Sequence, residues 1–134
     1  MKKIVIQTRS KTGLLDITDE VEKAVRESKI KDGICIIFAP HTTAALTINE
    51  NADPSIREDI LAELNRLVPF NGRYRHMEGN AAAHIKSSIV GCSKSIIVGN
   101  SRLSLGTWQG IYFCEFDGPR QREIWIKIIP SNDG

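Results

Sequence analysis

The chain has 134 residues, of which 41% are hydrophobic and 25% are charged, so its composition is that of an ordinary globular domain. The formal net charge of +2 is too small to indicate a nucleic-acid-binding protein. The first apolar run, residues 4–6, is too short for a signal peptide or a membrane span. We therefore expect a cytoplasmic protein with no nucleic-acid or membrane partner.

The first half of the chain is predicted to contain three strands and two helices. Apolar or alternating patterns predict strands over residues 3–9, 33–40 and 42–50. Residues 15–30 have helical periodicity, with a cap at Thr18 or Asp19. A second helix is predicted to begin where Asp53 precedes Pro54, because aspartate caps helices and proline favours the first helical position.

The second half is predicted to contain a loop, one short helix and strand pairs. The loop covers residues 69–80, and the helix runs between Asn80 and Gly91. Residues 93–106 read as a strand, a Gly–Asn turn and a return strand, and residues 107–130 as two strands joined at "DGPR". The fold prediction is a single α+β domain over residues 1–134, with a large mixed, mostly antiparallel β-sheet and two to three helices.

The three cysteines give no sign of a disulfide framework or a metal motif. Cys35 and Cys114 lie in apolar runs, and no CxxC spacing joins them to Cys92. Small, buried, reduced side chains are the expected role of such cysteines.

All three histidines lie where predicted elements begin or end, at His41, His76 and His84. Three imidazoles can hold a metal ion and leave a position open for water or substrate. The spacing does not match the HxxxH pattern of a metal-binding helix. From the residues alone, a shared metal site and three separate surface histidines both remain open.

Other polar residues suggest a site without defining it. Glu50, at the far end of the strand that follows His41, is a candidate general base or a partner that orients a histidine. Arg73 and Arg75 could meet a phosphate, or could simply form a solvated basic loop.

Trp108 lies between two glycines, Gly106 and Gly110. Glycines beside an aromatic residue suggest backbone packed closely around a flat group. That group could be a planar ligand, or Trp108 could enter the core beside a tight turn.

Three long blocks carry a family resemblance: "HTTAALTINENADPSIRED", "YRHMEGNAAAHIKSSIVG" and "NSRLSLGTWQGIYFCEF". They resemble, in order, the blocks of the largely uncharacterised YjbQ-like family, commonly labelled secondary thiamine-phosphate synthase, and the resemblance covers residues 13–129. The family's three histidines match His41, His76 and His84, its Asn–Glu pair matches residues 49–50, and its Gly-Thr-Trp-Gln turn matches residues 106–109. Where the family pattern reads "NADAH", this chain has Ala82 in place of the acidic residue, so a mechanism that needs that carboxylate is not supported here.

The resemblance implies a homotrimer with polar pockets at subunit boundaries. It also implies an enzyme that joins a pyrimidine-methyl diphosphate to a thiazole phosphate with a divalent metal, zinc or magnesium. Glu50 and His41 would be catalytic, and the three histidines would hold the metal. The phosphorylated ligand would meet a larger polar set: Asn49, Asn80, Lys86, Thr107, Trp108, Gln109, Arg73 and Arg75. Two alternatives remain, a zinc-dependent hydrolase with a three-histidine site and a non-catalytic ligand-binding trimer.

Overall fold

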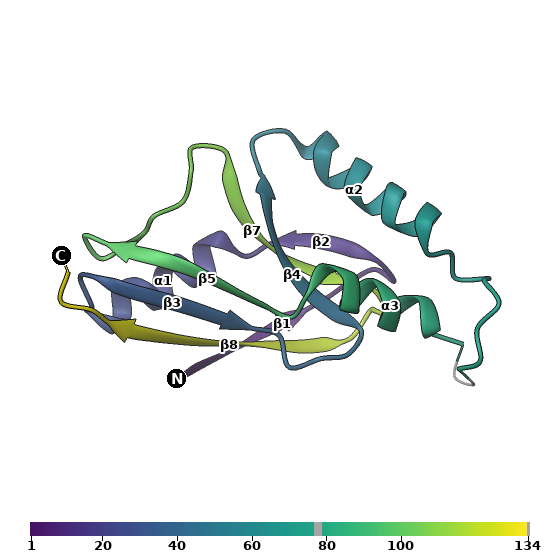
Figure 1. Ribbon diagram of the computed structural model, residues 1–134, viewed down its shortest axis with the longest axis horizontal. Helices are drawn as coiled ribbons and strands as arrows, with labels where there is room; N and C mark the ends of the chain where they lie inside the picture. The colour runs from purple at the N-terminus through teal and green to yellow at the C-terminus, as the bar shows by residue number, and fades with distance from the viewer. Residues whose placement is uncertain (77–78, 134) are drawn as a thin grey trace.

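The structure is a computed structural model that describes residues 1–76 and 79–133. Within these residues it contains eight strands and three helices (Figure 1), which confirms the predicted α+β class. In chain order they are β1 (Lys2–Gln7), β2 (Gly13–Asp16), α1 (Thr18–Ser28), β3 (Gly33–Phe38), β4 (Ala44–Glu50), α2 (Pro54–Leu67), α3 (Ala81–Val90), β5 (Ser93–Gly99), β6 (Arg102–Leu103), β7 (Gln109–Glu115) and β8 (Gln121–Pro130).

The strands are divided between two sheets. One has five strands in the order β1-β8-β3-β5-β6, and the other has three in the order β2-β7-β4. Each pair of neighbouring strands is antiparallel. In Figure 1, β4 and β7 rise steeply across the direction of β3, β5 and β8.

The two strands predicted to join at "DGPR" do not pair with each other. β7 belongs to the smaller sheet and β8 to the larger one, so residues 116–120 cross between sheets. Backbone hydrogen bonds hold this crossing to the N-terminal region: Thr8 N–H donates to Arg120 at 3.1 Å, and Gly118 N–H donates to Lys11 at 2.9 Å. The burial of the two strands also differs. Residues Gly110–Glu115 of β7, the middle strand of the smaller sheet, are all buried, whereas the first half of β8 alternates between buried and more exposed residues.

The main core lies between the two sheets and α1. Its fully buried side chains include Val21 and Val25 of α1, Ile37 of β3 and Phe113 of β7. This arrangement fixes α1 against the inner face of the larger sheet. No helix among the described residues is long and apolar enough to cross a membrane.

The helices α2 and α3 begin where the sequence predicts. Asp53 caps α2, since its side chain accepts a hydrogen bond from Ser55 N–H at 2.9 Å, and Pro54 occupies the first helical position. Helix α3 follows Asn80 and ends at Gly91. Its inner side is tied to the start of β4, because Ser87 Oγ donates to the carbonyl oxygen of Ala44 at 2.6 Å.

Candidate anion-binding site

The structure brings two of the three histidines into contact. The ring centroids of His76 and His84 are 4.9 Å apart, in an edge-to-face arrangement. His41 and His84 both line a cavity of about 350 Å³, which Cys92 also lines. Within residues 1–76 and 79–133, no three His, Cys, Asp or Glu side chains form a group that could hold a metal ion. The predicted three-histidine metal site therefore stays a prediction, and no chemical step is derived from it.

His41 is held by the backbone of β8. Its Nε2 atom lies 3.0 Å from both the nitrogen and the oxygen of Glu123. Burial lowers the pKa of His41 below its ordinary value, although the hydrogen bond to Glu123 acts in the opposite direction. The imidazole is therefore neutral near pH 7, with one ring nitrogen already occupied.

Glu50 lies at the opposite end of β4 from His41. A strand of this length spans about 20 Å, and in Figure 1 β4 begins beside α3 and ends where the chain turns into α2. The carbonyl oxygen of Glu50 accepts a hydrogen bond from Tyr112 Oη at 2.9 Å, and Asn49 Oδ1 accepts the Glu50 N–H at 2.7 Å. Within one copy of the chain, Glu50 and His41 do not belong to one site.

The Gly-Thr-Trp-Gln turn lies at this same far end. Gln109 is the register partner of Glu50, and its Oε1 atom accepts from Gly106 N–H at 2.8 Å. Thr107 is exposed, and Trp108 is 64% exposed, so the interpretation of Trp108 as a core residue is wrong. The prediction that Thr107, Trp108 and Gln109 bind a ligand stays open.

Gly110 has a packing role. A Cβ atom at this position would lie 2.5 Å from Asn51 Nδ2, so the missing side chain makes room for Asn51. That amide in turn donates to Asp16 Oδ2 at 3.3 Å. The close backbone approach predicted here therefore accommodates a neighbouring side chain of the same protein.

Lys86, one of the predicted ligand contacts, is completely buried. Its Nζ atom donates to Asn65 Oδ1 at 2.5 Å and lies 4.0 Å from the centroid of the Phe70 ring. Burial, together with the nearby charge of Lys11, lowers the pKa of Lys86. The loop residues Arg73 and Arg75 are exposed.

A polar cavity lies where the start of β4, the start of α3 and the crossing from β7 to β8 meet. Its volume is about 400 Å³, and it is lined by Lys11, Thr42, Thr43, Gly79, Asn80, His84, Asp117 and Arg120. Of the predicted site residues, Asn80 and His84 line it. The others come from separate segments of the chain, including the start of the strand predicted over residues 42–50 and the turn at "DGPR", and only the tertiary fold brings them together.

Among the described residues that line the cavity, there are more cationic than anionic side chains. Asp117 Oδ2 lies 3.0 Å from Arg120 Nη2, and Asp117 Oδ1 lies 4.0 Å from Lys11 Nζ. One carboxylate therefore faces two cations. Asn80 Nδ2 also donates to Asp117 at 2.9 Å, which leaves Asn80 Oδ1 buried without a partner among the described residues.

Helix α3 begins at this wall without a side-chain cap. Asn80 is the N-cap residue, but its side chain binds Asp117 and makes no hydrogen bond to the first turn. Uncapped N–H groups and the helix dipole favour an anion at such a position. Together with Lys11 and Arg120, this makes the cavity suited to an anionic ligand.

A buried ion pair, Glu115 with Arg122, is hydrogen-bonded to two residues of the cavity wall, Asp117 and Thr43. The carboxylate of Glu115 accepts hydrogen bonds from Arg122 Nε at 2.9 Å and from Arg122 Nη2, from Thr8 Oγ1 at 2.7 Å and from Asp117 N–H at 3.0 Å. Burial raises the pKa of Glu115, but the hydrogen bonds from Arg122, Thr8 and Asp117 outweigh it, and the pKa lies below its ordinary value. The charge of Arg122 is thereby neutralised, so it adds nothing to the excess at the cavity.

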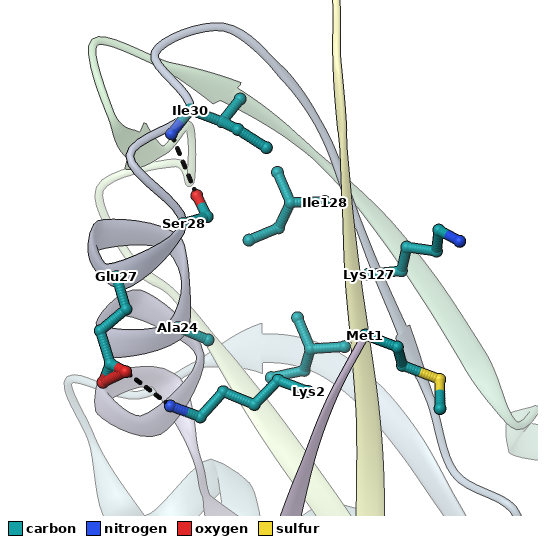
Figure 2. A pocket seen from close by; sticks show the side chains of 9 residues that line it. Met1, Lys2, Ala24, Glu27, Ser28, Ile30, Lys127 and Ile128 are labelled. Carbon is teal, nitrogen blue, oxygen red and sulfur yellow. Dashed lines mark hydrogen bonds and ion pairs between the residues drawn. The ribbon is translucent and has the colours of Figure 1, made fainter.

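A cavity of about 320 Å³ lies elsewhere, between α1 and β8 (Figure 2). Ala24 and Ile128 are among its lining residues, and the rim carries Lys2 and Glu27, whose charged groups lie 2.7 Å apart. Lys127 also lines this cavity, but in Figure 2 its side chain extends away from α1. The charged groups of Lys2 and Glu27 are already paired with each other.

Comparisons of sequence agree with the blocks described above. The family described as UPF0047 protein YjbQ-like matches residues 2–131. A UPF0047 protein of Methanocaldococcus jannaschii is 56% identical over 127 residues, which are 95% of this chain and 92% of that protein. The UPF0047 protein YugU of Bacillus subtilis is 52% identical over 130 residues, covering 96% of this chain and 98% of that protein.

Comparisons of structure give the same result. The crystal structure of a YjbQ/UPF0047 family protein of Clostridium acetobutylicum is similar with a TM-score of 0.95 at 52% identity, and the match covers 96% of this chain and 100% of that chain. A YbjQ-like protein of Sulfolobus solfataricus is similar with a TM-score of 0.93 at 37% identity, covering 97% and 96%. These similarities establish the fold and leave the reaction to be argued from the site.

Proposed function

Because the chain belongs to the UPF0047 family of YjbQ-like proteins and the described residues of its polar cavity have an excess of positive charge, we propose that this cavity binds a phosphorylated small molecule. The observation that carries the proposal is that Asp117, the one carboxylate among the described lining residues, faces both Lys11 and Arg120. An anion entering the cavity would balance the second cation. The guanidinium of Arg120 also suits phosphate, since its planar donors can bind two oxygens at once.

The reaction proposed for this cavity is of the thiamine-phosphate synthase type. A pyrimidine-methyl diphosphate loses diphosphate as its methylene carbon bonds to the ring nitrogen of a thiazole phosphate. Lys11 and Arg120 would stabilise the negative charge that develops on the departing diphosphate, a role that fixed cations perform well in a partly enclosed site. His84 lines the same cavity, so its imidazole can donate a hydrogen bond or a proton to a phosphate oxygen.

A zinc-dependent hydrolase is the second candidate, and the contact between His76 and His84 favours it. The residues of the described chain supply no third ligand for such a pair. The synthase is expected to use a divalent cation such as Mg²⁺, which proteins usually bind through one or two carboxylates and the phosphates of the substrate, whereas the hydrolase needs zinc bound by histidines. Metal analysis of the protein purified without added metal therefore distinguishes the two candidates. Stoichiometric zinc that disappears in His84→Ala would favour the hydrolase.

Calorimetric titration with inorganic phosphate and with diphosphate tests the binding proposal. Lys11→Gln and Arg120→Gln should each weaken binding about tenfold or more, since a hydrogen bond to a charged group is worth roughly 1.5–3 kcal/mol. Lys127→Gln is the matched control, because Lys127 is an exposed lysine that lines a different cavity. Equal binding by the parent protein and both cavity variants would refute the site.

Turnover is tested separately from binding. The pure protein is incubated with both phosphorylated substrates and Mg²⁺, and thiamine phosphate is measured by chromatography. Formation of product by the parent protein and its loss in Arg120→Gln would support the transferase. If no product forms over hours while diphosphate still binds, the reaction is wrong and the phosphate site stands.

A further inference from the structure

The hydroxyl group of Thr43, a residue of the cavity wall, donates no hydrogen bond to the residues that the structure describes. The residue is only 6% exposed and lines the cavity. Its Oγ1 atom accepts a hydrogen bond from Arg122 Nη2 at 2.9 Å. A hydroxyl group has one donor and two acceptor positions, and no acceptor for the Thr43 proton occurs in the described part of the chain.

The hydroxyl group of Thr8, by contrast, has partners for both its donor and its acceptor positions. Its Oγ1 atom lies within donor distance of Glu115 Oε1, at 2.7 Å, and of the Arg120 carbonyl oxygen, at 2.9 Å, and it accepts from Arg120 N–H at 2.9 Å. The hydrogen bonds of the Thr8 hydroxyl are therefore made to groups of the protein itself. Among the described residues, Thr43 Oγ1 is bound only by Arg122, so within this part of the chain its donor is unused.

Arg122 fixes the direction of the Thr43 hydroxyl. The guanidinium is buried, and Glu115 holds it through both Nε and Nη2. Nη2 also lies 3.2 Å from the carbonyl oxygen of Thr43, so the same group holds both the backbone and the side chain of that residue. With one lone pair of Oγ1 occupied by Arg122, the hydroxyl proton is left to point away from the guanidinium.

We propose that Thr43 is a specificity-determining residue, whose hydroxyl donates to a phosphate oxygen in the cavity, and that Arg122 is the positioning residue that aims it. This inference rests on the proposed phosphate site. Lys11 and Arg120 attract any anion, whereas a hydroxyl of fixed direction adds a donor that a tetrahedral oxyanion, with oxygens on several sides, can meet together with the cations. A planar carboxylate has only two oxygens in one plane. The site should therefore prefer phosphate esters and diphosphates to carboxylates.

Calorimetric titration of four proteins with inorganic phosphate, and separately with acetate, tests the role of Thr43. Thr43→Val removes the hydroxyl at nearly constant shape and should weaken phosphate binding about tenfold, with acetate binding unchanged. Thr43→Ser keeps the hydroxyl and should bind phosphate within about twofold of the parent protein. Thr47→Val, the same substitution further along β4, should match the parent protein.

The possible results separate this inference from the proposed function. If Thr43→Val binds phosphate like the parent protein, or loses phosphate and acetate equally, Thr43 does not determine specificity. If the parent protein binds no phosphate, or Lys11→Gln has no effect, the phosphate site itself is wrong and the inference fails with it.

The role of Arg122 is tested in the parent protein, so folding of a variant is not at issue. Nitrogen-15 spectra should show guanidinium protons of Arg122 that exchange slowly with water, both without and with saturating phosphate. Slow exchange in both states means that Arg122 keeps its contact with Thr43 while the anion binds. Rapid exchange of the Nη2 protons in either state would overturn the positioning role.

Discussion

The buried pair of Glu115 and Arg122 allows one prediction to be worked out in detail. Glu115→Gln keeps the volume of the side chain but replaces one acceptor oxygen with an NH₂ donor. The native carboxylate accepts four hydrogen bonds, from Arg122 Nε, Arg122 Nη2, Thr8 and Asp117 N–H. Whichever way the amide is turned, at least one of these donors meets another donor.

The magnitude follows from the burial of Arg122. Its side chain is 4% exposed and stays charged, because arginine does not lose its proton in proteins. Removing the partner of a buried charge costs about 3–5 kcal/mol in the free energy of unfolding. For a chain of this length, each kcal/mol shifts the melting temperature by about 3–4 °C. We therefore expect Glu115→Gln to melt about 10–20 °C below the parent protein at pH 7.

The pH dependence gives a second, independent signature. The native pKa of Glu115 lies below its ordinary value of 4.5, so the ionised carboxylate stabilises the folded state. That contribution is fully present above the unfolded pKa and is lost as pH falls through the native pKa. The difference in stability between the parent protein and Glu115→Gln should therefore narrow once the pH falls below about 4.5.

Urea unfolding followed by circular dichroism, repeated from pH 7 to pH 3, measures both effects. Glu63→Gln is the control, because Glu63 forms an exposed ion pair with Arg66 and should change stability little. A loss of less than about 1 kcal/mol at pH 7 for Glu115→Gln, against the range expected for a buried pair, would refute the reasoning. A difference in the free energy of unfolding between the parent protein and Glu115→Gln that stays constant from pH 7 to pH 3 would also refute it.

Three further predictions concern packing, accessibility and assembly. Gly33→Ala should lower the free energy of unfolding by about 1–3 kcal/mol in urea titrations, because its Cβ would lie 2.1 Å from the carbonyl oxygen of Ile129. Gly13→Ala, with nothing within 4 Å of the new Cβ, should be neutral or slightly stabilising. If Gly33→Ala and Gly13→Ala changed the free energy of unfolding equally, the predicted clash at Gly33 would be wrong. An amine-reactive label should modify Lys11, whose side chain is 59% exposed, and spare the buried Lys86, as peptide mass spectrometry would show; rapid labelling of Lys86 would contradict its burial. Light scattering should give three times the chain mass of 14.9 kDa, and a monomer at micromolar concentration would exclude the homotrimer.

Local signals in the sequence predicted most of the secondary structure. The helix starts at Asp53 and Asn80 depend on neighbouring residues only, and the structure has both. The apolar runs around Cys35 and Cys114 predicted burial, and both side chains are buried. Burial raises the pKa of Cys35 to about 11 and that of Cys114 to about 12, as expected for thiols without a nucleophilic role.

The candidate site could not be predicted in the same way, because its walls come from distant segments. Lys11, Thr43, Asp117 and Arg120 converge only after β7 and β8 have entered different sheets. The local preferences of the turn residues at "DGPR" predict a hairpin. In the structure, β7 and β8 pair instead with strands that are distant in the sequence. His76 and His84 are the exception, since one loop and one short helix are enough to bring them into contact.

The pairing of the first strand with the last one has a consequence during synthesis of the protein. β1 lies at the edge of the larger sheet and pairs with β8, where Lys2 is opposite Ile126. A growing chain exposes β1 long before its partner leaves the ribosome, and such distant pairings fold slowly. The hydrogen bond from Thr8 N–H to the Arg120 carbonyl oxygen, which holds the crossing segment, can likewise form only after residue 120 has been synthesised. Anion binding should therefore be among the last properties that a nascent chain acquires, and ribosome-bound chains that stop before β8 should lack it.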